Sequence, residues 1–177
     1  LVGKQSVIQQ YLENKPKNQQ YYHSISIIDA PETICKDDKP SRIFKTKPNS
    51  SIVKAIQLLK ENQADAVVSS GDTGVLLSTS LFLIGKIDSI KRPALAPYIP
   101  SLKKGFILCD AGANVDTKPE HLVQFAIMSQ CYLRNISNIK NPKIGLLNIG
   151  KEANKGNELT KQVYPLLKKE FKDAFIG

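Results

Sequence analysis

Short runs of strand-forming residues alternate with longer stretches of helical periodicity, and this alternation constrains the fold more than any other feature. We expect strands at 26–28, 66–68, 106–109 and 143–147, and a fifth strand beginning at 174–177. Strand–helix alternation at this spacing predicts right-handed crossovers and a mostly parallel sheet with helices on both faces. The expected fold class is therefore α/β, with residues 1–177 in a single domain.

The expected helices carry recognisable start signals. Ser50 and Ser51 precede apolar residues at helical spacing, so they are candidate helix caps. Pro119 suits a first helical position, and Glu120 suits the positive end of a helix dipole. Pro165 falls inside the last helical pattern, where we expect it to kink or restart the helix.

Three glycine-containing loops follow expected strands: "SSGDTG" at 69–74, "DAGANVDTK" at 110–118 and "NIGKEANKG" at 148–156. In a parallel sheet these loops would emerge at one edge, where open α/β sheets bind ligands. Small residues let backbone amides approach a ligand, and helix N-termini favour an anion, most simply phosphate. The alternative is that they are only tight turns. None matches the dinucleotide-binding or P-loop fingerprint.

Charge and cysteine content narrow the function classes. The formal net charge of +9 indicates an anionic partner, but no RNA-binding or zinc-finger motif is present, so nucleic acid is not expected. Three cysteines without metal-like spacing favour a reducing, cytoplasmic location. The longest apolar stretch, 75–84, is too short to span a bilayer.

Longer segments carry a family resemblance: "KPNSS" at 47–51, "SSGDTGVLL" at 69–77, "RPALAP" at 92–97, "DAGANVDTKPEHLVQFAIM" at 110–128 and "GLLNIGKEANKGNELT" at 145–160. The chain resembles the phosphate:acyl-acyl carrier protein acyltransferases of bacterial phospholipid synthesis, the PlsX family. The resemblance implies transfer of a fatty acyl group from acyl carrier protein to inorganic phosphate, forming acyl phosphate, with no cofactor. It also implies a homodimer and a fold like that of phosphate acetyltransferases and isocitrate dehydrogenases.

Two departures from the family pattern are visible. Asp72 stands where the family usually has an asparagine, and a carboxylate there would repel a phosphate lying against it. The family's opening glycine-rich loop and its later segments have no counterpart here. We therefore expect an internal portion of a longer family domain. Peripheral membrane contact and much of the dimer interface would belong to the parts not included.

Attack of phosphate on a thioester needs position and charge rather than a Ser-His-Asp relay. The candidate catalytic residues lie in or beside the second and third loops: Lys155, Asn114, His121 and Lys118. The lysines would hold phosphate, or simply be solvated. His121 would act as a general base, or hold the loop. Candidates for phosphate and substrate binding share a place in a glycine loop or at a helix start: Ser51, Gly71, Thr73, Gly74, Asp110, Gly112, Asn148, Gly150, Glu152 and Gly156.

Several alternatives stay open. Asp110 ends an expected strand and would orient its loop by accepting amide hydrogens, and Glu152 would orient Lys155. No metal site is expected. The segment 92–97 would shape an acyl entrance or serve as a stiff connector. Acyl-coenzyme A as donor, and an inactive lobe that binds phosphate or acyl carrier protein, are rival functions. A nucleotide-dependent dehydrogenase lacks its fingerprint.

Overall fold

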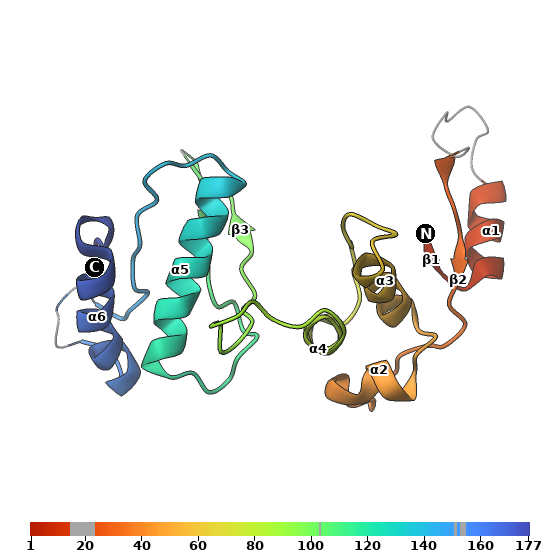
Figure 1. Ribbon diagram of the computed structural model, residues 1–177, viewed down its shortest axis with the longest axis horizontal. Coiled ribbons are helices and arrows are strands. Elements are labelled where there is room, and N and C mark those ends of the chain that lie inside the picture. Colours follow the sequence, from red (N-terminus) through yellow and green to blue (C-terminus); the bar gives the residue numbers. More distant parts are fainter. Residues whose placement is uncertain (15–23, 103, 151, 153–154) are drawn as a thin grey trace. The chain divides into compact units, whose positions relative to one another are not determined.

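The chain divides into two compact units, Leu1–Lys86 and Ile87–Gly177. The computed structural model describes residues 1–14, 24–102, 104–150, 152 and 155–177 (Figure 1). Each unit is built around its own helices and is described by itself. The expectation of one domain over residues 1–177 stays a prediction.

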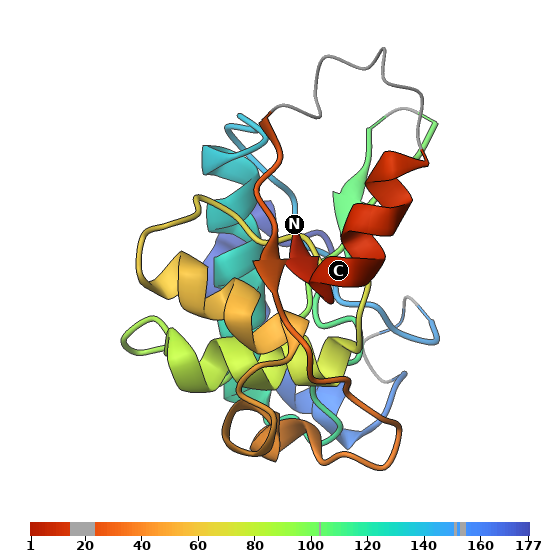
Figure 2. The same cartoon turned by 90° about the vertical axis from the view of Figure 1, so that its right-hand side faces the viewer.

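The first unit opens with a small parallel pair of strands. Strand β1, Val2–Gly3, pairs in parallel with β2, Ile28–Asp29. Helix α1, Gln5–Glu13, follows β1 directly and contacts it (Figure 2). The strand predicted at 26–28 is thus present as Ile28–Asp29, which overlaps the prediction at Ile28.

Three helices supply the core of this unit. They are α2 (Ile43–Thr46), α3 (Ser51–Lys60) and α4 (Thr73–Leu83), and a 3-10 turn, Pro40–Arg42, precedes α2. Apolar residues of α3 spaced by one, three or four positions face inward, as the helical pattern predicted. The buried cluster consists of Ile43, Ile52, Val53, Ile56 and Val75.

The second unit combines an antiparallel hairpin with two long helices. Strand β3, Tyr98–Ile99, pairs in antiparallel fashion with β4, Phe106–Ile107. Helices α5, Pro119–Asn135, and α6, Glu158–Phe171, pack against each other (Figure 1). A 3-10 turn, Lys172–Ala174, closes α6. The buried apolar residues of the two helices are Phe125, Val163 and Leu167.

The observed mixture of helices and small sheets is consistent with an α/β class, but the expected large parallel sheet is not confirmed. Residues 66–68 form no strand, and β4 pairs antiparallel rather than parallel. The segments 143–147 and 174–176 meet in a single parallel bridge between Ile144 and Phe175. Strands need partners that are distant in the sequence, so an apolar run alone does not fix how far pairing extends.

Two local predictions at helix positions are confirmed only in part. Ser50 occupies the N-cap position of α3, but its Oγ donates to the carbonyl of Lys47 at 2.8 Å and caps no helix amide. Helix α6 is continuous through Pro165, so the helix does not restart there, while the expected kink stays a prediction. Val163 and Leu167 are buried on either side of this proline, so packing holds the helix although Pro165 has no amide hydrogen to donate.

Candidate functional site

The loop at 110–118 is organised by the carboxylate of Asp110. Its Oδ1 accepts the backbone N–H of Leu95 at 2.7 Å, and its Oδ2 accepts the backbone N–H of Asn114 at 2.8 Å. The side-chain Nδ2 of Asn114 donates to the same Oδ2 at 3.1 Å and to the carbonyl of Pro93 at 2.9 Å. Asp110 therefore orients its loop as expected. Both amide hydrogens of Asn114 are already engaged, so Asn114 would have to exchange a partner to donate to a ligand.

The backbone conformation of the 110–118 loop requires glycine at one position. Gly112 adopts a φ of +96°, and no heavy atom lies within 4 Å of the place where a Cβ would stand. The left-handed backbone requires glycine, and the space beside it is open. An approaching ligand would meet backbone here rather than a side chain.

His121 holds the start of α5. Its Nδ1 accepts the backbone N–H of Lys118 at 3.1 Å, and its own backbone N–H donates to the carbonyl of Lys118 at 2.9 Å. The ring is buried and lies near Phe125. Nδ1 of His121 therefore already accepts a backbone hydrogen bond. This arrangement supports the loop-holding role, because the basic nitrogen is already occupied.

The loop at 148–156 is closed by Asn148. Its Nδ2 donates to the carbonyl of Lys155 at 3.1 Å, and its Oδ1 accepts the N–H of Ile149 at 2.9 Å. Gly156 has a φ of +99°, and a Cβ there would lie 2.1 Å from Oγ1 of Thr160 and 2.4 Å from Oδ1 of Asn148. Glycine is thus required at Gly156 both by conformation and by space. Asn157 caps α6 by accepting the N–H of Thr160 at 2.9 Å.

The other candidates of this loop are Gly150, Glu152 and Lys155. A Cβ at Gly150 would meet Oε2 of Glu152 at 2.8 Å and Cγ of Lys155 at 3.1 Å, so these three residues are close together. The backbone N–H of Lys155 donates to the carbonyl of Glu152 at 3.0 Å. Lys155 and Lys118 are both exposed, and neither takes part in an ion pair seen in the described part of the chain. Their ammonium groups are available to an anion.

A cavity of about 650 Å³ lies beside the 110–118 loop of the second unit. Asp110, Asn114 and Thr117 line it from the first loop, and Leu147 and Thr160 line it beside the second. The rest of its wall is largely apolar and comes from β4, α5, α6 and the segments at 142–147 and 176. The volume is in the range of small-molecule sites.

The loop at 69–74 belongs to the first unit. Asp72 caps α4, because its Oδ1 accepts the N–H of Val75 at 2.8 Å. The carboxylate therefore occupies the helix start, where an anion would otherwise bind. A Cβ at Gly71 would lie 2.8 Å from Cδ1 of Ile52, so close packing explains that glycine. Thr73 and Gly74 begin α4 and are exposed, and Ser51 is the half-buried first residue of α3.

Two titratable groups near the second-unit loops are perturbed. Burial raises the pKa of the Cys109 thiol, which also lines the cavity. A hydrogen bond from Lys91 lowers the pKa of Glu120, in the first turn of α5. The first effect makes the thiol a poorer nucleophile. Among the described residues, no group of three or more His, Cys, Asp or Glu side chains could hold a metal ion.

Sequence reasoning missed the partner that anchors the 110–118 loop. The segment 92–97 supplies the carbonyl of Pro93 and the N–H of Leu95, and Arg92 donates to the carbonyl of Asp116 at 3.1 Å. Ala111 also donates its N–H to the carbonyl of Leu95 at 2.8 Å. The prolines at 93 and 97 were the only signal, since they indicated a stiff segment without showing what it holds.

The described residues form a mixture of helices and small sheets, and the glycine loop at 110–118 lines a cavity in the second unit. All of residues 1–177 match the family described as "Fatty acid synthesis protein", and the chain belongs to that family. It is 48% identical over 169 aligned positions to the phosphate acyltransferase of Bacillus pumilus, covering 95% of this chain and 49% of that protein. It is 47% identical over 178 positions to the phosphate acyltransferase of Geobacillus thermodenitrificans and 45% identical over 178 positions to that of Bacillus subtilis. These alignments cover the whole chain and 52% of each relative. The chain thus spans about half the length of these relatives.

Proposed function

We propose that the protein containing this chain transfers a fatty acyl group from acyl-acyl carrier protein to inorganic phosphate, forming acyl phosphate for phospholipid synthesis. The observation that carries the proposal is the cavity beside the 110–118 loop in the second unit. Apolar side chains form most of its wall, and Asp110, Asn114 and Thr117 line it from the loop. The apolar lining suits an acyl chain, and the hydroxyl of Thr117 can donate to phosphate, while the Asp110 carboxylate is assigned to holding the loop.

The reaction needs only bond exchange at one carbon. A phosphate oxygen attacks the thioester carbonyl carbon, the new C–O bond forms, and the C–S bond breaks. The thiolate leaves and takes up a proton from solvent. Because phosphate is already a nucleophile at neutral pH, alignment within about 3–3.5 Å and donors for the developing oxyanion supply most of the catalysis.

Roles follow from which groups are available. Lys155 and Lys118 are exposed and would provide positive charge to phosphate, and backbone amides beside Gly112 and Gly150 would approach it. Asn114 would help only by giving up its bond to Pro93 or Asp110. His121 positions the Asp110–Lys118 loop in this proposal and is not a proton acceptor, because its Nδ1 is already occupied.

The remaining binding candidates have roles in shaping the loops or in orienting Lys155. Asn148 and Gly156 would shape the second loop, Glu152 would orient Lys155, and Asp110 would shape the first. Within the first unit, Ser51, Gly71, Thr73 and Gly74 stay proposed binding residues, with Asp72 as the helix cap rather than a ligand.

Partners and setting complete the proposal. The partners are inorganic phosphate and the acidic acyl carrier protein, for which the net charge of +9 is complementary. We place the protein in the cytoplasm as a homodimer with a phosphate acetyltransferase-like, mostly parallel sheet, and with peripheral membrane contact through other parts of the full protein. Among the described residues, no helix has the length and apolar character needed to cross a bilayer.

The test is acyl phosphate formation from palmitoyl-acyl carrier protein and labelled phosphate. The chain and a version extended at both ends would be assayed side by side, each also with palmitoyl-coenzyme A. We expect product from the carrier-bound donor with the extended version. Product only from the coenzyme A donor would contradict the proposed donor. No product from either donor, with carrier binding retained, would replace the enzyme by a binding module.

A further inference from the structure

One face of α5 forms a continuous wall of the cavity in the second unit. The residues of this face recur at helical spacing: Leu122, Phe125, Ala126, Ser129, Gln130 and Leu133. At about 1.5 Å per residue, the wall from Leu122 to Leu133 is about 16 Å long. Thr117, in the loop proposed for phosphate, lines the same cavity and precedes this face in the sequence. The wall therefore leads away from the phosphate loop along one helix.

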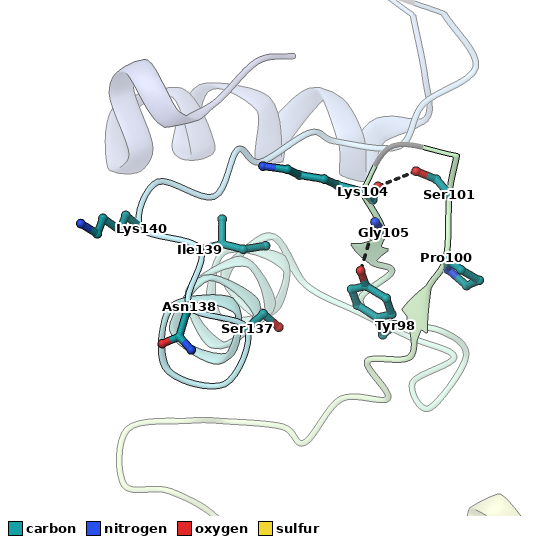
Figure 3. Close-up of a pocket in the computed structure, with 9 residues that line it drawn as sticks. All are labelled: Tyr98, Pro100, Ser101, Lys104, Gly105, Ser137, Asn138, Ile139 and Lys140. Carbon is teal, nitrogen blue, oxygen red and sulfur yellow. Dashed lines mark hydrogen bonds between the residues drawn. The ribbon is translucent and has the colours of Figure 1, made fainter.

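The end of this wall that lies away from the loop is marked by a change from apolar to polar lining. A second pocket, of about 610 Å³, begins there (Figure 3). Gly105, the residue before Phe106, lines this second pocket, and so does Ser137, four residues beyond Leu133. Lys104 also lines it. An alkyl chain gains free energy only along apolar surface, so its favourable path ends at Phe106 and Leu133.

The β3–β4 hairpin holds this end of the cavity in place. The hydroxyl of Tyr98 accepts the N–H of Gly105 at 3.1 Å (Figure 3). A Cβ at Gly105 would lie 2.3 Å from Cζ of Tyr98, so the ring lies directly against the glycine backbone. Phe106 therefore follows a position that both hydrogen bonding and packing fix.

We propose that the face of α5 from Leu122 to Leu133 limits the length of the donor's acyl chain. The thioester lies at the Asp110–Lys118 loop, and the methyl end of the chain lies at Phe106 and Leu133. With carbon–carbon bonds of about 1.52 Å in staggered geometry, an extended chain advances about 1.25 Å per carbon, so roughly 13 carbons lie along this face. The donors that fit are therefore long-chain acyl groups of about 14–16 carbons. The inference rests on the proposed function, which sets the direction of the chain.

The experiment compares acyl phosphate formation by the extended protein from hexanoyl-, palmitoyl- and stearoyl-acyl carrier protein. Each methylene kept out of an apolar site costs about fourfold in binding. Ala126→Leu fills the middle of the face, so kcat/KM for the palmitoyl donor should fall by about fifteenfold or more, as for two excluded methylenes. The hexanoyl donor should be unaffected, because its chain ends before this position. Leu133→Ala should act in the opposite direction and raise the stearoyl-to-palmitoyl ratio by about fourfold.

Cys131→Leu is the matched control, because Cys131 lies on α5 but is exposed and does not line the cavity. It adds bulk to the same helix and should leave the chain-length profile unchanged. A second readout needs no catalysis. Palmitate should slow the alkylation of Cys109 by N-ethylmaleimide in the chain itself, because Cys109 lines the cavity, while the exposed Cys35 and Cys131 react as before. Mass spectrometry separates the three thiols, and Ala126→Leu should weaken the protection.

The outcomes separate this inference from the proposed function. Acyl phosphate formation with the same chain-length profile in every variant would overturn the inference and leave the proposed function intact. Failure of palmitate to protect Cys109 would also overturn the inference. Protection that Ala126→Leu weakens, in an extended protein that forms no acyl phosphate, would support the acyl site and refute the proposed function. Thermal unfolding midpoints would reveal a variant that fails to fold, and the remaining variant, with its effect of opposite sign, would then decide.

Discussion

The carboxylate of Asp110 accepts both the backbone N–H and the side-chain Nδ2 of Asn114 on one oxygen, at 2.8 and 3.1 Å. Its other oxygen holds the N–H of Leu95 at 2.7 Å. A single side chain thus joins the two ends of a glycine-rich turn to the segment that precedes the β3–β4 hairpin. The loop that we propose for phosphate depends on this one acceptor.

Replacing Asp110 by asparagine should therefore loosen the loop. The substitution keeps the shape but turns one acceptor into a donor that faces N–H groups. Hydrogen bonds to charged groups contribute about 1.5–3 kcal/mol each, so we expect a loss of about 2 kcal/mol in the free energy of unfolding. Urea titration would measure it. Asp116→Asn is the control, because Asp116 is exposed and only its backbone carbonyl is bonded to Arg92. A loss of equal size in both variants would contradict the anchoring role.

Gly156→Ala should destabilise the chain more than Gly112→Ala. Both glycines have a positive φ, +99° and +96°, but only at Gly156 would a Cβ meet other atoms, with Thr160 Oγ1 at 2.1 Å. Backbone strain alone costs about 1–2 kcal/mol, and the overlap at Gly156 adds to it. Denaturant midpoints of the two variants would decide. Equal midpoints would show that the side chains around Thr160 move aside without lowering the free energy of unfolding.

Acid should weaken the first unit through Asp38. The hydrogen bond from Lys47, at 2.5 Å, lowers the pKa of Asp38 below its ordinary value of 3.8, and the backbone N–H of Cys35 helps. A carboxyl group whose folded pKa is lowered stabilises the fold above its unfolded pKa, and this stability is lost as the pH falls through the folded value. The same pair raises the pKa of Lys47 above 10.5, so its contribution is present below that pH and is lost only in stronger alkali.

The measurement is the thermal unfolding midpoint between pH 7 and about pH 2.5. We expect a flat profile near neutral pH and a fall below about pH 4, smaller in Asp38→Asn than in the unchanged chain. Asp37→Asn is the neighbouring control, because Asp37 is exposed and forms no ion pair seen in the described part of the chain. If the unfolding midpoint of Asp38→Asn falls in acid as much as that of the unchanged chain, the Asp38–Lys47 pair contributes nothing to stability at low pH.

The helices could be predicted from sequence because their signals are local. The apolar spacing after Ser51 and the proline at 119 placed α3 and α5 correctly. Strands could not be predicted equally well, since Val67 and Val68 have strand-forming side chains but no partner in the structure as described. Pro165 is the opposite case. Its residue type disfavours a helix interior, but buried residues on either side keep it helical.

The site residues stay a prediction, but the sequence did pick out two glycines of the loops. Gly112 and Gly156 were chosen as places where backbone could approach a ligand, and the structure gives both a positive φ, which glycine adopts without strain. The engagement of Asn114 by Pro93, and of His121 by the amide of Lys118, depends on where the chain returns in space. Spacing along the sequence does not predict these contacts. The sequence alone therefore could not show which polar side chains are hydrogen-bonded and which are free.

Lys155→Met should raise the KM for phosphate in acyl phosphate formation by the extended protein. Removing the ammonium group eliminates charge-assisted hydrogen bonds to phosphate, which corresponds to about tenfold or more in binding. The KM for the acyl donor should change little, because the lysine is assigned to the anion. Lys168→Met removes an equal charge from an exposed position in the last turn of α6 and should leave both constants unchanged. Lys155→Arg should restore part of the phosphate affinity. If the methionine variants at 155 and 168 behave alike, Lys155 is a solvated surface lysine, and Lys118 becomes the cation to test.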